Sequence, residues 1–274
     1  MKYDYFLHKL FSAHQTHTGN LTIRNGETNH IEFLNTAKSY ATHTPILDQN
    51  GRQLQHIDGN LDMRNLSVFI NGKLKTVSGN LFADGANRIH LSALQSIHGD
   101  LHIDATTKFY ADALESVRGN IWARGARNTT LDELQKIGGN LIVKNQSAVF
   151  IPKLARVEQT IFAENVSELN LPELKSAQTI YAINVAQIEL PHWTNGNLYI
   201  SKQNTPNKIN VGQSVKIVYG DYHLSDAMIQ AAINTQAATQ RTSAHLNRIG
   251  ATDIRTTATR IYNRLWQAIN QKKR

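Results

Sequence analysis

Two carboxylates at the same point of neighbouring repeats are the residues of this sequence best placed for acid–base chemistry. Asp84 and Asp104 lie 20 residues apart in segments of similar sequence. Stacked one repeat above the other, they could hold a cation or flank a glycosidic bond. Arg64 and Arg124 occupy the same position one repeat before and after, and their charges would neutralise the pair. Surface salt bridges are therefore the favoured interpretation, and a carbohydrate-active solenoid enzyme using Asp84 and Asp104 is the alternative.

The other reactive residue types form no catalytic or metal-binding pattern. The chain has 12 histidines but no HExxH motif, and only His14, His17 and His43 could meet near the first repeats. It has no cysteine, which excludes disulfides, thiolate metal sites and a cysteine nucleophile. P-loop, GxGxxG and GxSxG motifs are also missing. We therefore predict a non-enzymatic protein with no cofactor and no bound metal.

A row of large side chains suggests binding instead. We number each 20-residue repeat from the residue after its Gly-Asn or Gly-Asp pair, and position 2 then holds a large, mostly aromatic residue in seven consecutive repeats. The members of this aromatic row are Phe82, His102, Trp122, Ile142, Phe162, Tyr181 and Tyr199. Aromatic side chains are the usual anchors of protein interfaces. The row is predicted to bind a partner, and the alternative is that the C-terminal helices lie over it.

Positive charge is concentrated at the end of the chain. The formal net charge is +8, and residues 225–274 hold 8 basic and 2 acidic residues. The arginines expected to contact a partner there are Arg241, Arg248, Arg255, Arg260 and Arg264. A basic segment on a neutral body favours binding to a polyanion or an acidic protein surface. A packed cap, a dimerisation hairpin and a solvated tail are the alternatives.

The elements that would position these residues come from the 20-residue repeat. Positions 1 and 3 are apolar, position 14 is leucine, and position 17 is isoleucine or valine. The Gly-Asn and Gly-Asp pairs begin at Gly19, Gly59, Gly79, Gly99, Gly119 and Gly139. Apolar residues on either side of a different residue class predict a short strand with one buried face. Stacked units of this size predict a mainly β protein, a parallel β-solenoid of about ten rungs.

Two further positions describe the turns of each rung. The Gly-Asn pair is expected to form a turn that tolerates positive φ, and Asn or Gly at position 5 marks the turn after the strand. Asn at position 20 is expected to form a ladder in which side-chain amides bond from rung to rung.

The repeat resembles a known pattern. The matching segments are Leu74-x-x-Val77-x-Gly79-x-Leu81 and Leu94-x-x-Ile97-x-Gly99-x-Leu101-x-Ile103. They are similar to the L-x-x-I-x-G-x-L-x-I core of receptor L domains, which are relatives of leucine-rich repeats, and related repeats occur in fungal cell-wall proteins. The resemblance covers about residues 19–200 and implies a right-handed β-solenoid used for binding. It implies no catalytic residue, and the chain departs from secreted receptors by lacking cysteines and a signal peptide.

The sequence outside the repeats predicts two further domains. A short N-terminal cap is expected at residues 1–18, the solenoid at 19–222 and a basic C-terminal helical hairpin at 223–274. Val215, Ile217 and Tyr219 alternate with other residues and predict a last strand. Ser225-Asp226 is typical of a helix start, Gly250 of its stop, and Thr252-Asp253 of a second helix start.

Together these features predict a non-enzymatic macromolecular binding protein. It would bind, and could inhibit, a protein or nucleoprotein complex, and it would suit a phage or mobile-element inhibitor. Nucleic acid could bind through the hairpin, a homodimer is compatible with the sequence, and a structural, self-assembling solenoid is a further alternative. No apolar run reaches the ~18 residues of a transmembrane helix. Asp4, His8 and Lys9 make the start a poor secretory signal, so we expect a cytoplasmic protein with no membrane partner.

Overall fold

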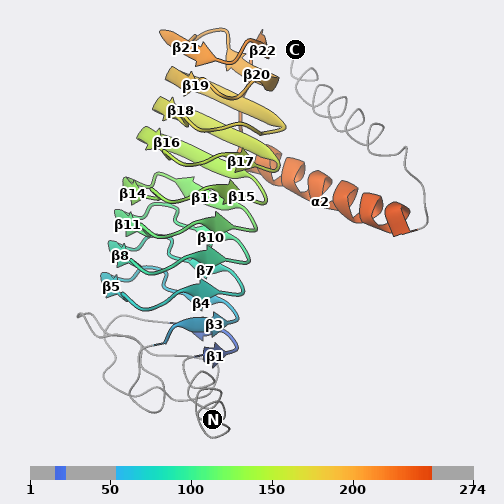
Figure 1. Ribbon diagram of the computed structural model, residues 1–274. Helices are drawn as coiled ribbons and strands as arrows, with labels where there is room; N and C mark the ends of the chain where they lie inside the picture. Colours follow the sequence, from blue (N-terminus) through green and yellow to red (C-terminus); the bar gives the residue numbers. More distant parts are fainter. Residues whose placement is uncertain (1–15, 23–53, 249–274) are drawn as a thin grey trace, which may run out of the picture. The chain divides into compact units, whose positions relative to one another are not determined.

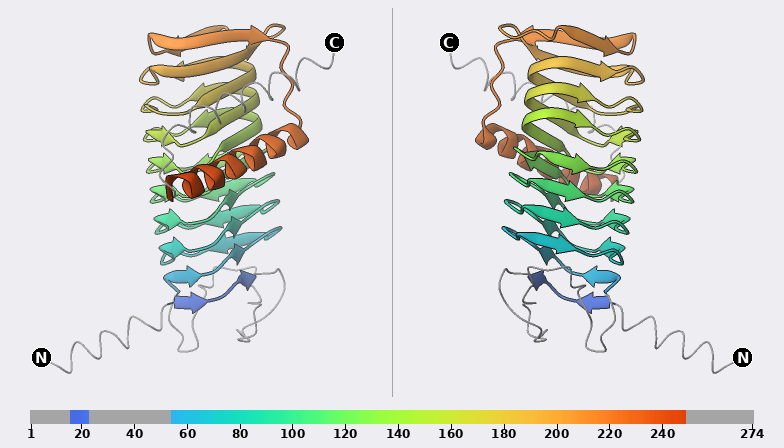
Figure 2. Two further views of the ribbon diagram at one scale, coloured as in Figure 1. Left: turned by 90° about the vertical axis from the view of Figure 1, so that its right-hand side faces the viewer. Right: turned by 90° about the vertical axis from the view of Figure 1, so that its left-hand side faces the viewer.

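The computed structural model of the protein describes residues 16–22 and 54–248 (Figure 1). The chain forms two compact units, Met1–Gly220 and Asp221–Arg274. In the described part of the first unit, stacked rungs form a mainly β, parallel solenoid of about eight turns (Figure 2). The degenerate rung expected near Ala41 lies outside the described residues, as does nearly all of the expected N-terminal cap.

Three sheets form the sides of the solenoid, and every strand pair in them is parallel. The seven-stranded sheet contains, in order, β1 (Thr16–Thr18), β3 (His56–Asp58), β6 (Thr76–Val77), β9 (Ser96–Ile97), β12 (Ser116–Val117), β15 (Lys136–Ile137) and β17 (Arg156–Val157). The four-stranded sheet contains β5 (Val68–Ile70), β8 (Arg88–His90), β11 (Lys108–Tyr110) and β14 (Asn128–Thr130).

The 11-stranded sheet is the largest of the three. It contains β2 (Leu21–Thr22), β4 (Leu61–Asp62), β7 (Leu81–Phe82), β10 (Leu101–His102), β13 (Ile121–Arg124), β16 (Leu141–Phe150), β18 (Thr160–Asn170), β19 (Thr179–Leu190), β20 (Asn195–Ser201) and β22 (Ser214–Gly220), with β21 (Lys208–Val211) paired to β19. The predicted last strand is confirmed, because β22 contains Val215, Ile217 and Tyr219.

The repeat positions predicted to be apolar form the core between the sheets. Position 1 stacks in one column, since Leu101 pairs in register with Leu81 and Ile121, and Ile121 pairs with Leu141. The leucines of position 14 and the β-branched residues of position 17 are likewise buried, from Leu54 and Ile57 upward. A 20-residue unit buries these columns only against its neighbours, so the core exists only in the stack.

Positive φ was predicted for the Gly-Asn pairs, but it is found mainly at the turn residues of position 5. Asn65, Gly85, Gly125 and Asn145 have φ between 55° and 68°. Among the glycines of the Gly-Asn and Gly-Asp pairs, Gly19 has a φ of 100° and Gly59 of 156°, whereas those from Gly79 to Gly139 lack positive φ and need a different explanation. At Gly99, a Cβ would lie 2.7 Å from the carbonyl carbon and oxygen of the glycine one rung below, so glycine is required there by the close approach of two backbones.

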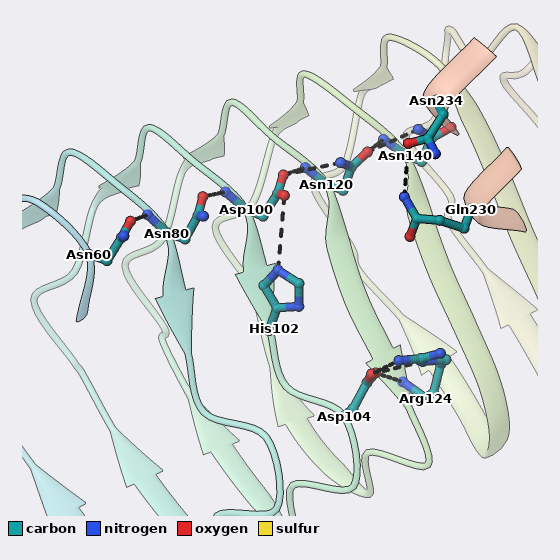
Figure 3. Close-up of polar contacts among 10 residues, drawn as sticks. All are labelled: Asn60, Asn80, Asp100, His102, Asp104, Asn120, Arg124, Asn140, Gln230 and Asn234. Atoms are coloured by element: carbon teal, nitrogen blue, oxygen red, sulfur yellow. Dashed lines mark hydrogen bonds and ion pairs between the residues drawn. The ribbon is translucent and has the colours of Figure 1, made fainter. Parts of the chain in front are cut away.

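The asparagine ladder at position 20 forms, but mainly with backbone donors (Figure 3). The backbone N–H of Asn80 donates to Oδ1 of Asn60 at 2.7 Å, and that of Asn140 donates to Oδ1 of Asn120 at 2.8 Å. The predicted amide-to-amide bond occurs at position 20 between Asn140 and Asn120, where Nδ2 donates to Oδ1 at 2.9 Å, and also at position 5, where Nδ2 of Asn165 donates to Oδ1 of Asn145 at 3.0 Å. The ladder at position 20 therefore satisfies partly buried backbone N–H groups at a corner of the rung. Bonds between side-chain amides alone would leave these N–H groups unpaired.

In the second unit the structure describes one helix, α2 (Asp226–Arg248). Its start is as predicted, because the backbone N–H of Met228 donates to Oγ of Ser225 at 3.2 Å, and Asp226 lies in the first turn. The second helix expected from Thr252-Asp253 lies outside the described residues. No helix in the described ranges is long and apolar enough to span a membrane.

Candidate functional site

Strand alternation places the aromatic row on the outer face of the 11-stranded sheet. Leu101 and Ile103 point into the core, so His102 between them points outward. Parallel register then aligns the row: His102 pairs with Phe82 and Trp122. The other members pair in the same way, from Ile142 through Phe162 and Tyr181 to Tyr199. The structure thus brings together all seven residues selected from the sequence.

The lower half of the row is a continuous stack of rings. The ring centroids of Phe82 and His102 are 4.8 Å apart, with an angle of 31° between the planes. The centroids of His102 and Trp122 are 6.0 Å apart, and their planes are within 9° of parallel. Because each ring leans on the next, the three side chains form one strip rather than three independent contacts.

A second stack forms the upper half. Phe162 and Tyr181 stack with centroids 5.6 Å apart, and Tyr181 and Tyr199 with centroids 4.8 Å apart. Ile142 separates the two stacks. Burial raises the pKa of the Tyr199 phenol, so its hydroxyl stays neutral in the physiological range.

Guanidinium groups flank the lower stack at both ends. Cζ of Arg64 lies 5.6 Å from the ring centroid of Phe82, and Cζ of Arg124 lies 5.2 Å from that of Trp122. Each arginine is also held by a carboxylate, Arg64 by Asp62 with its Nη2 2.6 Å from Oδ2, and Arg124 by Asp104. Sequence reasoning treated these arginines only as neutralising charges. Trp122 and Arg124 share one repeat, whereas Arg64 contacts the ring of the next repeat, so the two contacts had no common sequence signal.

The exposure of the row differs along its length. Phe82, His102 and Tyr199 are half-buried. Trp122 is 8 % exposed, and Ile142, Phe162 and Tyr181 are 0–2 % exposed. Solvent therefore reaches the row mainly at its two ends, of which the lower end carries the two arginines.

The carboxylates at position 4 connect rungs rather than facing each other across a cleft. Oδ1 of Asp84 accepts the backbone N–H of Asp104 at 2.9 Å, and Oδ1 of Asp104 accepts that of Arg124 at 2.7 Å. Oδ2 of Asp104 also accepts Nε of Arg124 at 2.8 Å (Figure 3). Desolvation and the charge of Asp104 raise the pKa of Asp84 above its usual range. Of the two aspartates only Asp104 forms an ion pair, with Arg124, and Asp84 is held by its bond to the backbone of Asp104.

A buried ion pair continues position 4 above these residues. Nζ of Lys144 lies 2.7 Å from Oε2 of Glu164, and their side chains are only 15 % and 7 % exposed. Opposite charges at one position of neighbouring repeats were the sequence signal for this pair. Removing either partner would leave a buried charge without its counter-ion.

The remaining predicted residues are only partly described. His17 lies in β1, whereas His14 and His43 lie outside the described residues. In the described ranges, no three His, Asp or Glu side chains gather closely enough to hold a metal ion. Arg241 and Arg248 lie in α2, and Arg255, Arg260 and Arg264 lie outside the described residues.

Comparison with known proteins gives no relative for this chain. No protein-family model matches it, and neither a curated protein nor a solved structure matches it. The resemblance to receptor L domains therefore rests on the repeat motif. The structure agrees with the fold implied by this resemblance in being a parallel β-solenoid.

Proposed function

We propose that this chain is a non-enzymatic binding protein whose solenoid presents the outer face of its 11-stranded sheet to a protein or nucleoprotein partner. The observation that carries the proposal is the lower stack, Phe82, His102 and Trp122, with an arginine over the ring at each end. A rigid aromatic strip with a charged rim matches the composition of interface centres, which are rich in aromatic residues and arginine. The accessible part of this strip is Phe82 and His102.

A protein surface suits the lower stack better than a nucleic-acid base. Bases bind by stacking on open ring faces. Here the faces of His102 are occupied by its two neighbours, Phe82 and Trp122, so the stack offers mainly ring edges. Nucleic acid remains part of the proposal only through the basic C-terminal segment, whose charge would attract phosphate.

Hydrogen bonding argues against the carbohydrate-active alternative. A general acid or nucleophile needs oxygen atoms that can reach a substrate. Asp104 is engaged by Arg124 through both of its oxygens, and Asp84 uses one oxygen to hold the amide of Asp104. Replacing both aspartates by asparagine should leave the activity of this protein intact if it acts by binding.

The proposal also includes the handedness of the solenoid, its number of rungs and a second C-terminal helix. The motif supports a receptor-L-like, right-handed solenoid of about ten rungs. An apolar stripe at helical spacing, formed by Ile254, Ala258, Ile261, Leu265 and Ile269, supports a second C-terminal helix. Such a hairpin would serve as a cap, a dimer contact or an arm for an acidic partner.

Comparative affinity capture tests the proposed surface. Wild-type protein, the Phe82→Ala/His102→Ala variant and the control Tyr219→Ala are immobilised and exposed to extract from the native host. Tyr219 is a suitable control because it is 48 % exposed and lies in β22, outside the row. The proposal expects a protein that is retained by wild type and control but lost from the row variant. Equal capture by all three folded proteins would contradict it.

A further inference from the structure

The third side of the solenoid is interrupted between two rungs. β13 pairs with β16, and β15 pairs with β17, so this rung boundary is hydrogen-bonded on two sides. On the third side, β14 pairs only with β11, and the matching part of β16 pairs only with β18. Figure 1 shows β14 as the uppermost of β5, β8, β11 and β14, with β16 next above it. We call this unpaired boundary between residues 127–131 and 146–150 the seam.

Backbone groups on both edges of the seam lack the hydrogen bonds that join the neighbouring rungs below and above it. One rung below, the N–H of Ala111 donates to the carbonyl of Thr130 at 3.1 Å, and one rung above, the N–H of Ile151 donates to that of Asn170 at 3.3 Å. The equivalent N–H of Leu131 makes no such bond to Phe150, and no backbone hydrogen bond joins the two ranges of the seam. The seam is therefore a pair of facing strand edges, each with unpaired donors and acceptors.

The seam arises where the rungs change the shape of one corner. In the lower rungs the amide at position 6 closes a tight turn onto position 3, as from Ala86 to Ala83 at 3.1 Å. In the upper rungs, β16, β18 and β19 run through the same corner without that turn. At the boundary, the side chain of Gln146 donates to the carbonyl of Ala123 instead. The seam therefore lies at the boundary between rungs with the tight turn and rungs without it.

Packing between neighbouring rungs is less complete at this place. Thr129 is half-buried in a column where Ile89, Phe109 and Leu169 are fully buried. The Oγ1 atom of Thr129 is buried and has no hydrogen-bond partner among the described residues. Val149, across the seam, is 5 % exposed. A polar residue in an apolar column, with an unsatisfied oxygen, marks a point where packing between rungs is incomplete.

The lower side of the seam carries mostly basic residues and the upper edge carries an exposed ring, while Asp132, next to Leu131, is exposed and Glu168 lies one rung above Ala148. Arg88, Lys108 and Arg127 lie on the lower side, and within the described residues none of them has an ion-pair partner. Phe150, on the upper edge, is 55 % exposed. These cations would attract carboxylates, and the ring offers an apolar contact beside them.

We propose that the seam binds an extended, acidic segment of a partner protein as an added strand. Strand addition satisfies unpaired edge groups, and alternate side chains of the added strand then face opposite sides. Its inner side chains would meet Thr129 and Val149, which favours small β-branched residues. Its outer side chains would meet Lys108, Arg127 and Phe150, which favours acidic residues. The bonded sheets on the other two sides act as the hinge about which the third side opens.

Binding of designed peptides tests the seam. The probe is a fluorescein-labelled decapeptide that alternates valine and glutamate, and the matched peptide alternates valine and lysine. Saturable binding of the glutamate peptide alone is expected. The variant Arg88→Glu/Lys108→Glu/Arg127→Glu should bind it at least about tenfold more weakly. The control Lys75→Glu/Arg118→Glu/Lys175→Glu makes the same charge change at exposed residues beside the seven-stranded sheet and should bind normally.

Amide hydrogen exchange locates the peptide. Because no strand pairs with the lower edge of β16 at residues 146–150, the amides of Ala148 and Phe150 should exchange fast in the free protein and slowly with the peptide bound. The amide of Ile151, already bonded, should change little. Slow exchange of Ala148 and Phe150 in the free protein would overturn the proposal. So would failure of the glutamate peptide to bind at millimolar concentration, or equal binding by the two charge variants.

Discussion

The ring of His102 lies parallel to the ring of Trp122, with centroids 6.0 Å apart and planes within 9°, on neighbouring rungs of one sheet. The arrangement follows from a 20-residue repeat, which sets equivalent side chains side by side at the spacing of β-strands. Flat side chains in register then stack without further constraint. The same register aligns the asparagines at the corner of neighbouring rungs, which hydrogen-bond from one rung to the next.

The centre of the aromatic row should be important for stability. Phe162 is fully buried and Trp122 nearly so. Truncating a buried aromatic residue to alanine costs roughly 3–5 kcal/mol. We expect Phe162→Ala to lower the free energy of unfolding by about that amount in urea titrations. A loss below about 1 kcal/mol would mean that this ring is not packed.

The asparagine ladder should contribute through the backbone groups that it satisfies. Oδ1 of Asn120 accepts the backbone N–H of Asn140 at 2.8 Å and its side-chain amide at 2.9 Å. Asn120→Ala would leave these buried donors unpaired, and we expect a loss of about 1–3 kcal/mol in unfolding free energy. Asn204→Ala, which removes an exposed ladder bond to Asn184, should cost less than about 0.5 kcal/mol. Similar losses for both variants would contradict this role.

Asp84 should make stability depend on pH in an unusual direction. Desolvation and Asp104 raise its pKa in the folded protein, so its contribution is fully present below the ordinary value of 3.8 and is lost as pH rises through the raised value. Asp84→Asn keeps an oxygen for the amide of Asp104 and removes the charge. The variant should therefore melt at a higher temperature than wild type near pH 7, and the difference should vanish near pH 3. A variant less stable than wild type near pH 7 would contradict the cause assigned here.

The basic C-terminal segment makes a separate prediction. If its partner is nucleic acid, the logarithm of affinity should fall with the logarithm of salt concentration, with a slope of about −0.9 per contacted phosphate on duplex DNA. Changing Arg241, Arg248, Arg260 and Arg264 to glutamine should flatten that slope while the solenoid stays folded. Filter binding or fluorescence anisotropy at several salt concentrations would measure it. An unchanged slope would show that these arginines do not contact the phosphates.

The repeat pattern was sufficient to predict a mainly β, parallel solenoid, because each of its positions has one physical task. Position 1 fills the core, position 5 forms the turn after the strand, and position 2 points outward. The start of α2 was predictable for a similar reason, since Ser225 caps it through a local bond. These features depend on residue type and spacing alone.

Other features depend on atoms that spacing does not describe. At Gly99 the need for glycine comes from the backbone of the rung below, and its φ is not the reason. The seam depends on whether the amide at position 6 bonds within its own rung, and the residue types there give no clear signal. The contacts of Arg64 and Arg124 with the rings depend on side-chain directions.

The most direct test of the proposed function is the affinity of the captured partner for the row variant. At roughly 2 kcal/mol for a hot-spot residue, removing even one such contact weakens binding about 30-fold. The Phe82→Ala/His102→Ala variant should therefore bind the purified partner at least about 30-fold more weakly than wild type in calorimetric titrations, while Tyr219→Ala binds normally and both variants stay folded. Unchanged affinity of the folded row variant would contradict the claim that this face binds the partner.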